Sequence, residues 1–183
     1  MSRFIPVAVP DLSGNEKKYV NDCLDTTWIS SNGSYIKRFE ESFAEYFDIN
    51  TVGRFVIGRF WNTATEAEQE EYIELFKKLI IKNYGSKMSM YTGEGFNVIG
   101  TRVESEKATV VSSKITHPGS KQTTNIDWRV GTKDGKMGII DVIIEGVSMS
   151  VTQKQEYASI IQRGGGNIES LLVLMRKQAG TGS

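Results

Sequence analysis

The stretch that decides the fold runs from Gln122 to Gly166 and reads QTTNIDWRVGTKDGKMGIIDVIIEGVSMSVTQKQEYASIIQRGGG. Asp134-Gly135 stands between two runs rich in apolar and β-branched residues, which is typical of a β-hairpin because its turn requires positive φ at the central residues. Alternation predicts one apolar face on each strand, made by Thr124, Ile126, Trp128 and Val130 on the first and by Ile140, Val142 and Ile144 on the second. Such a one-sided sheet requires a cover.

Turn signals and apolar periodicity predict the remaining elements. We expect strands at about 94–103, 108–116, 122–132 and 136–146, and their short connections indicate an antiparallel meander. We expect helices at about 13–24, 35–47, 52–61, 65–84, 152–163 and 167–178, two of which open with the capping boxes Ser13–Glu16 and Thr65–Glu68. The expected class is α+β, with a twisted four-stranded antiparallel sheet packed against several helices.

Composition excludes several classes of function. The 22 basic side chains balance 22 acidic ones, so there is no field to gather nucleic acid, and we expect no nucleic-acid partner. One cysteine and one histidine cannot form an internal disulfide or a metal site built from several such ligands. No run approaches the ~20 apolar residues of a membrane span, and residues 1–6 lack the core of a secretion signal, so the chain as written is expected to remain in the cytoplasm.

Three polar features have a functional and a structural interpretation. Gly164-Gly165-Gly166 could bind an anion through backbone amides, but without the Lys-Ser/Thr of a phosphate loop a helix stop is favoured. His117 lies in a turn with no nucleophile motif nearby, which favours an exposed turn histidine without a catalytic role. Cys23 lies beside acidic residues and lacks the positive surroundings of a reactive thiolate.

Asp141 and Glu145 lie four residues apart on one strand and could form a general acid/base pair. Arg129 stands opposite them on the sheet face, which favours solvation or cross-strand charge pairing instead. No catalytic group, metal site or cofactor is therefore predicted, and we expect a chain that is not an enzyme.

The apolar residues leave two interpretations open. They could fill an ordinary core, or they could surround a cavity between the sheet and the helices that holds an apolar ligand. The flexible side chains of Met88, Met90, Met137 and Met149 would adapt to such a ligand. Periodicity alone does not separate a filled core from a hollow one.

Six segments between about residues 47 and 178 resemble the MlaC or Ttg2-type (toluene-tolerance) family of phospholipid-binding ABC-transport auxiliary proteins. They read FDINTVGRFVIGRFWNTAT, YIELFKKLIIKNYG, YTGEGFNVIG, NIDWRV, DGKMGIIDVIIEGVSMSVTQKQEYASIIQRGGG and IESLLVLMRK, in the family's order. The resemblance implies a periplasmic, non-enzymatic carrier that moves phospholipid between an outer-membrane lipoprotein/porin complex and an inner-membrane ABC transporter. It implies a lipid pocket, for which we select Phe55, Phe76, Tyr84, Tyr91, Val98, Val111, Trp128, Val130, Ile140, Val142 and Ile144.

Residues 1–46 resemble a different family. The segment Trp28-Ile29-Ser30-Ser31 with Gly33, followed by the run from Phe39 to Tyr46, is similar to the start of DegT-type, pyridoxal-phosphate-dependent sugar aminotransferases. We therefore expect a fusion of a two-helix segment, 1–46, with a lipid-carrier domain, 47–183, that lacks the family's N-terminal helices. The alternatives are an aminotransferase fragment, although the cofactor-binding lysine motif is absent, and an interaction module with a filled core.

Overall fold

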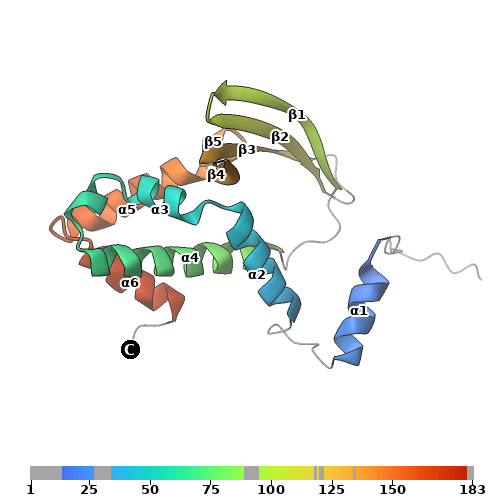
Figure 1. The fold of residues 1–183 in the computed structure, drawn as a ribbon, viewed down its shortest axis with the longest axis horizontal. Coiled ribbons are helices and arrows are strands. Elements are labelled where there is room, and N and C mark those ends of the chain that lie inside the picture. Colours follow the sequence, from blue (N-terminus) through green and yellow to red (C-terminus); the bar gives the residue numbers. More distant parts are fainter. Residues whose placement is uncertain are drawn as a thin grey trace, which may run out of the picture. The chain divides into compact units, whose positions relative to one another are not determined.

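A computed structural model describes residues 14–26, 34–88, 95–117, 119, 122–133 and 135–180 (Figure 1). The chain divides into two compact units, residues 1–39 and residues 40–183. The first contains helix α1 (Glu16–Asp25), which buries none of its residues, and helix α2 (Ser34–Tyr46) crosses the boundary. Ser13 of the first predicted capping box lies outside the described residues.

The second unit contains the predicted helices, but the one expected at 52–61 begins earlier and is divided at Gly58, which has a φ of 59°, into an α-helix and a 3-10 helix. These helices are α3 (Ile49–Ile57), the 3-10 helix η1 (Gly58–Thr63), α4 (Glu66–Met88), α5 (Met149–Arg163) and α6 (Glu169–Ala179). The capping box at the start of α4 is confirmed: Glu68 Oε2 accepts from the Thr65 amide at 2.8 Å, and Thr65 Oγ1 accepts from the Glu68 amide at 3.3 Å. None of the described helices is long and apolar enough to cross a membrane.

The predicted antiparallel meander is confirmed, but the sheet has five strands rather than four. The strands are β1 (Gly95–Ser105), β2 (Ala108–Thr116), β3 (Thr123–Lys133), β4 (Lys136–Ile144) and β5 (Val147–Ser148), in the order β1-β2-β3-β4-β5. Glu145 and Gly146 have φ of 48° and 81°, and this turn reverses the chain so that β5 pairs back onto β4. The predicted fourth strand, 136–146, therefore ends two residues early.

A bulge in β4 corrects the predicted facing of Ile140. Arg129 pairs with Asp141 while Val130 pairs with Ile139, so Ile140 is an extra residue in the ladder. A Cβ placed on Gly131 would lie 3.0 Å from Ile140 Cδ1, so Ile140 lies on the face of Gly131, away from Val130. The extra residue moves Ile140 off the face that it was predicted to share with Val142 and Ile144.

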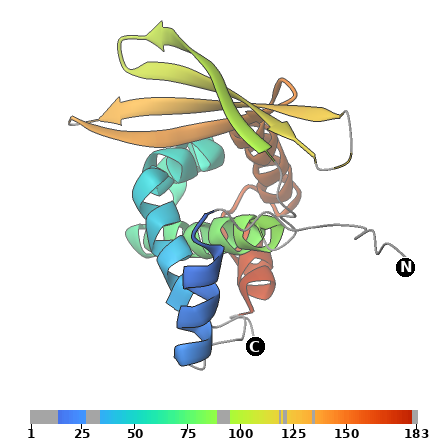
Figure 2. The same ribbon diagram turned by 90° about the vertical axis from the view of Figure 1, so that its right-hand side faces the viewer.

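The deepest packing lies among the helices. Side chains less than 2% exposed include Tyr72, Phe76, Val56, Ile161, Leu171, Leu172 and Met175. The Tyr72 hydroxyl donates to the Gly53 carbonyl at 3.0 Å, and burial raises the pKa of Tyr72. In Figures 1 and 2 the helices α3 and α5 lie next to the β4 side of the sheet, and β1 lies farthest from them. The sheet thus meets the helical core mainly through β4.

Candidate functional site

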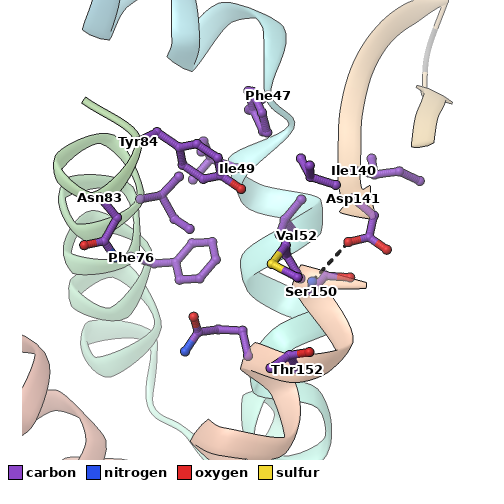
Figure 3. Close-up of a pocket in the computed structure, with 14 residues that line it drawn as sticks. Phe47, Ile49, Val52, Phe76, Asn83, Tyr84, Ile140, Asp141, Ser150 and Thr152 are labelled. Atoms are coloured by element: carbon purple, nitrogen blue, oxygen red, sulfur yellow. Dashed lines mark hydrogen bonds between the residues drawn. The ribbon is translucent and has the colours of Figure 1, made fainter. Parts of the chain in front are cut away.

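A cavity of about 180 Å³ lies beside strand β4 and is lined also by helices α3 and α4 and the first turn of α5 (Figure 3). Its walls are mostly apolar, and among the described residues no lysine or arginine lines it. The lining residues are Phe47, Ile49, Val52, Phe76, Ile80, Asn83, Tyr84, Ile140, Asp141, Val142, Met149, Ser150, Thr152 and Gln153.

The cavity exists because the edge of β4 is only partly paired. At one end Phe47 bridges to Ile139, and the Asp48 amide donates to the Ile139 carbonyl at 3.1 Å. At the other end β5 pairs with Ile143 and Ile144. The three residues between these contacts, 140–142, line the cavity. Their place in the strand, between two short pairings, is what positions the site.

Helix α4 supplies the opposite wall. Phe76, Ile80 and Tyr84 recur every four residues, so they form one stripe on the helix, and Figure 3 shows Phe76 and Tyr84 projecting toward α3 and β4. The ring of Tyr84 lies 5.1 Å from that of Phe43 and 5.9 Å from that of Phe47. Burial chiefly, and the Asp141 charge in addition, raise the pKa of Tyr84, so its hydroxyl stays protonated at neutral pH.

Asp141 is the charged group in this wall, and it is 5% exposed. Arg129 Nη1 lies 2.9 Å from Asp141 Oδ2, so the predicted cross-strand charge pairing is confirmed. Arg129 also binds Glu104, which lowers the pKa of Glu104 and, as its main cause, raises the pKa of Arg129. Glu145 turns away from Asp141 and accepts from the backbone and side chain of Asn125. The two carboxylates therefore do not face each other across a reaction site.

The other polar candidates have local partners. The amides of Gly164, Gly165 and Gly166 donate to carbonyls of Ile160, Gln162 and Ile161 in α5, as in a helix stop. Gly165 and Gly166 have φ of 82° and 84°, which favours glycine at both positions.

His117 and Cys23 offer no second site. His117 is half-buried rather than exposed as predicted, because its ring packs against β3, where its Nε2 lies 3.1 Å from Thr124 Oγ1. Cys23 is a free, half-buried cysteine on α1. The described residues contain no group of three or more histidine, cysteine, aspartate or glutamate side chains arranged to hold a metal ion.

The residues selected from the sequence fall into separate places. The cavity is lined by Phe76, Tyr84, Ile140 and Val142. The open sheet face, our term for the side of the sheet that carries the Trp128 side chain, contains Val98, Val111, Trp128, Val130 and Ile144. Val142 pairs with Trp128 and therefore belongs to both sets. Phe55 is 43% exposed on α3 beneath the Lys154 ammonium, and Tyr91 lies outside the described residues.

Most cavity residues that the sequence selection missed lie at element ends. Phe47 and Ile49 precede or open α3, while Ser150, Thr152 and Gln153 lie in the first turns of α5. Met149, expected to be adaptable, lines the cavity, whereas Met137 is exposed on β4. Helical spacing of Ile49 with Val52 was an available signal, since it places both on one face of α3. The polar α5 residues carry no comparable pattern.

Comparison with known proteins places this geometry in a family. The family model described as "MlaC protein" matches residues 28–177. The chain belongs to the MlaC family. The MlaC intermembrane phospholipid transport system binding protein of Haemophilus influenzae is 22% identical over 145 residues, covering 73% of this chain and 63% of that protein. The toluene tolerance protein ttg2D of Pseudomonas putida is 21% identical over 114 residues, covering 62% and 53%.

A solved structure supports the same fold. The phospholipid-binding protein from Ralstonia solanacearum, in complex with a phospholipid, matches with a TM-score of 0.71 at 22% sequence identity, over 90% of this chain and 94% of that one. This likeness shows the MlaC-type fold. The Phe43 side chain, which belongs to the segment set apart by sequence, is buried and stacks on Phe47 with ring centres 4.0 Å apart.

A short part of the chain is similar to a second group of proteins, as the sequence of residues 1–46 led us to expect. The GDP-perosamine synthase of Escherichia coli O157:H7 is 63% identical over 43 residues, which are 24% of this chain and 12% of that enzyme. The Vibrio cholerae synthase is 58% identical over 45 residues. The chain thus spans about an eighth of the length of these synthases and between half and two thirds of the MlaC-type relatives. The family model starts at residue 28, within the segment 1–46.

Proposed function

We propose that this chain is a non-enzymatic carrier that holds the acyl chains of a phospholipid. The observation that carries the proposal is a mostly apolar cavity beside β4 in a chain of the MlaC family. Each methylene removed from water contributes about 0.8 kcal/mol, so a dry cavity stabilises acyl chains without chemistry on the ligand. The paired state of Asp141 fits this role, because it leaves no unpaired charge in the wall.

The cavity volume constrains how a lipid is held. At about 180 Å³ it is close to an engineered cavity of about 150 Å³ that binds benzene, and well below the roughly 300 Å³ at which ligand pockets begin. An acyl chain therefore requires the walls to separate or must continue along the open sheet face. Val142, which belongs to the cavity and to that face, provides the connection.

The family relationship suggests partners and location. A relative is named a binding protein of an intermembrane phospholipid transport system, and by analogy we assign this chain to the periplasm. Its partners would be an inner-membrane ABC transporter complex and an outer-membrane lipoprotein/porin complex. Transfer of the phospholipid to such partners agrees with a carrier that releases its ligand when the cavity walls open.

Organic extraction of the purified full chain, followed by mass spectrometry, tests the proposal. We expect about one phospholipid per protein, and delipidated protein should take up a fluorescent phospholipid from vesicles. Protein without lipid that also fails to take up the probe would contradict the carrier role and would favour an interaction module. Val142→Arg, which places a charge in the cavity wall, should lose the lipid, whereas the matched variant Val98→Arg places the same charge on the exposed β1 and should retain it.

The aminotransferase alternative rests on the short synthase-like segment. That likeness covers 12% of the synthase. Addition of pyridoxal phosphate should give no Schiff-base absorbance beyond that of an unrelated protein with as many lysines. A saturable absorbance band at one equivalent would favour the alternative.

A further inference from the structure

Asp141 joins strand β4 to the start of helix α5 at the edge of the cavity. Its Oδ1 accepts from the Ser150 amide at 3.0 Å, and its Oδ2 accepts from the Ser148 hydroxyl at 2.6 Å and from Arg129 Nη1 at 2.9 Å. One buried carboxylate on β4 thus binds the start of α5 and the neighbouring strand β3 together.

The bond to α5 is a strong one for physical reasons. The Ser150 amide belongs to the first turn of the helix, where backbone donors have no partner within the helix. A carboxylate at this end also interacts favourably with the helix dipole, and hydrogen bonds to a charged acceptor are stronger than neutral ones. Ser148 completes the joint, because its Oγ accepts from the Val151 amide at 3.1 Å while it donates to Asp141.

The joint lies in the cavity wall. Ile140 and Val142 on one side of it, and Met149 and Thr152 on the other, all line the cavity, and Figure 3 draws the Asp141–Ser150 hydrogen bond at its edge. Separation of α5 from β4 would therefore open the wall. A cavity of about 180 Å³ is smaller than ordinary ligand pockets, so movement of this kind would let more of an acyl chain enter.

The arrangement around Arg129 lowers the cost of such an open state. Its Nε lies 2.7 Å from Glu104 Oε2, and its Nη2 lies 3.1 Å from Glu104 Oε1. If Asp141 moves with β4 away from Ser150, the Arg129 guanidinium still pairs with Asp141 on one side and with Glu104 on the other. The opening therefore breaks the bonds to α5 without leaving an unpaired cation.

We propose that Asp141 is the latch of the cavity: its bonds to Ser148 and Ser150 hold α5 against β4, and their release sets the rate at which lipid enters and leaves. This inference rests on the proposed carrier function. Asp141 is a positioning residue here, since it acts by holding the wall and forms no bond to the ligand.

The variant Asp141→Asn tests the latch, because it keeps the size of the side chain and removes its charge. Uptake and release of NBD-labelled phosphatidylglycerol are measured against phosphatidylcholine vesicles. Both rates should rise about tenfold, the factor that one charge-assisted hydrogen bond supports, while the equilibrium affinity changes less than either rate. Glu71→Gln, which breaks an ion pair between α4 and α6, should leave both rates unchanged.

Hydrogen exchange of the lipid-free protein gives a second readout. Asp141→Asn should raise amide exchange at the start of α5 and at residues 140–142, with no comparable rise in α6. Unchanged exchange and unchanged rates in a folded variant would overturn the latch. The latch would also be overturned if Asp141→Asn lowered the Tm no more than Glu71→Gln does and had the same rates of lipid uptake and release as Glu71→Gln. If the wild-type chain takes up no lipid, the carrier function fails, and hydrogen exchange alone decides whether Asp141 holds the wall.

Discussion

Strands β4 and β1 belong to one sheet and both carry closely spaced apolar residues, but they lie in different environments. Val142 on β4 is 4% exposed, whereas Val98 on β1 is 59% exposed, and both lie on the same face of the sheet. All residues of β1 are exposed. Helices α3 and α5 pack on β4, while β1 pairs with β2 and contacts β3 through side chains such as Glu104 and Phe96. Alternation decides which side chains share a face, and the helices decide which of them leave water.

An arginine introduced on β4 and, separately, on β1 should give the largest difference in effect between these two strands. Val142→Arg buries an unpaired cation in the cavity wall, which should lower the free energy of unfolding by about 4 kcal/mol or more and abolish lipid retention. Val98→Arg should change stability by less than about 0.5 kcal/mol. Urea unfolding and lipid extraction measure both effects. Retention of lipid by Val142→Arg would show that the cavity beside β4 is not the binding site.

Truncation of a phenylalanine gives the next largest contrast. Phe76 is fully buried and lines the cavity, so Phe76→Ala should cost about 3 to 4 kcal/mol and enlarge the cavity. Phe96 on β1 is 53% exposed and contacts Trp128 at its edge, so Phe96→Ala should cost less than about 1 kcal/mol. Thermal unfolding with and without bound lipid tests the pair. Equal losses of stability in the two variants would contradict the contrast.

Much of this fold follows from local chemistry, and the exceptions have identifiable causes. The Thr65–Glu68 capping box, the meander and the pairing of Arg129 with Asp141 were all predicted, because each depends on residues whose spacing sets their geometry. The bulge at Ile140 was not predicted, because nothing in an apolar run marks which residue is extra. The fifth strand was missed because Glu145, a non-glycine residue, adopts positive φ.

The site was harder to predict than the fold. Phe76 and Val142 were selected because they lie on apolar stripes of α4 and β4. The contribution of Ser150 depends on where α5 begins relative to β4, and that is a tertiary relationship. Likewise, Val98 has the same pattern as Val142 but no helix above it. The assignment of residues 1–46 and 47–183 to two fused proteins stays a prediction.

A smaller effect is expected where β4 meets α5. Ser148→Ala removes the side chain that caps α5 and donates to Asp141, which should lower stability by about 1 to 2 kcal/mol. Thr65→Ala removes the exposed cap of α4, and its cost should be about 1 kcal/mol without any effect on lipid release. Chemical denaturation gives both values. A lipid release rate raised by Thr65→Ala as much as by Ser148→Ala would show that general loosening, rather than the β4–α5 joint, controls release.

The smallest change is expected at the open edge. Ile99 on β1 is 61% exposed, and β1 pairs with β2 alone among the described strands, so its other edge presents backbone donors and acceptors to solvent. Ile99→Lys should alter the free energy of unfolding by no more than about 0.5 kcal/mol, because the side chain is already in water. The lysine should instead reduce aggregation on heating, since a charged edge strand disfavours pairing with another chain. Light scattering during a thermal ramp measures this, with Ile99→Val as the control that keeps an apolar edge. A fall in Tm approaching that of Val142→Arg would mean that β1 is covered in solution, and the difference between the two ends of the sheet would no longer hold.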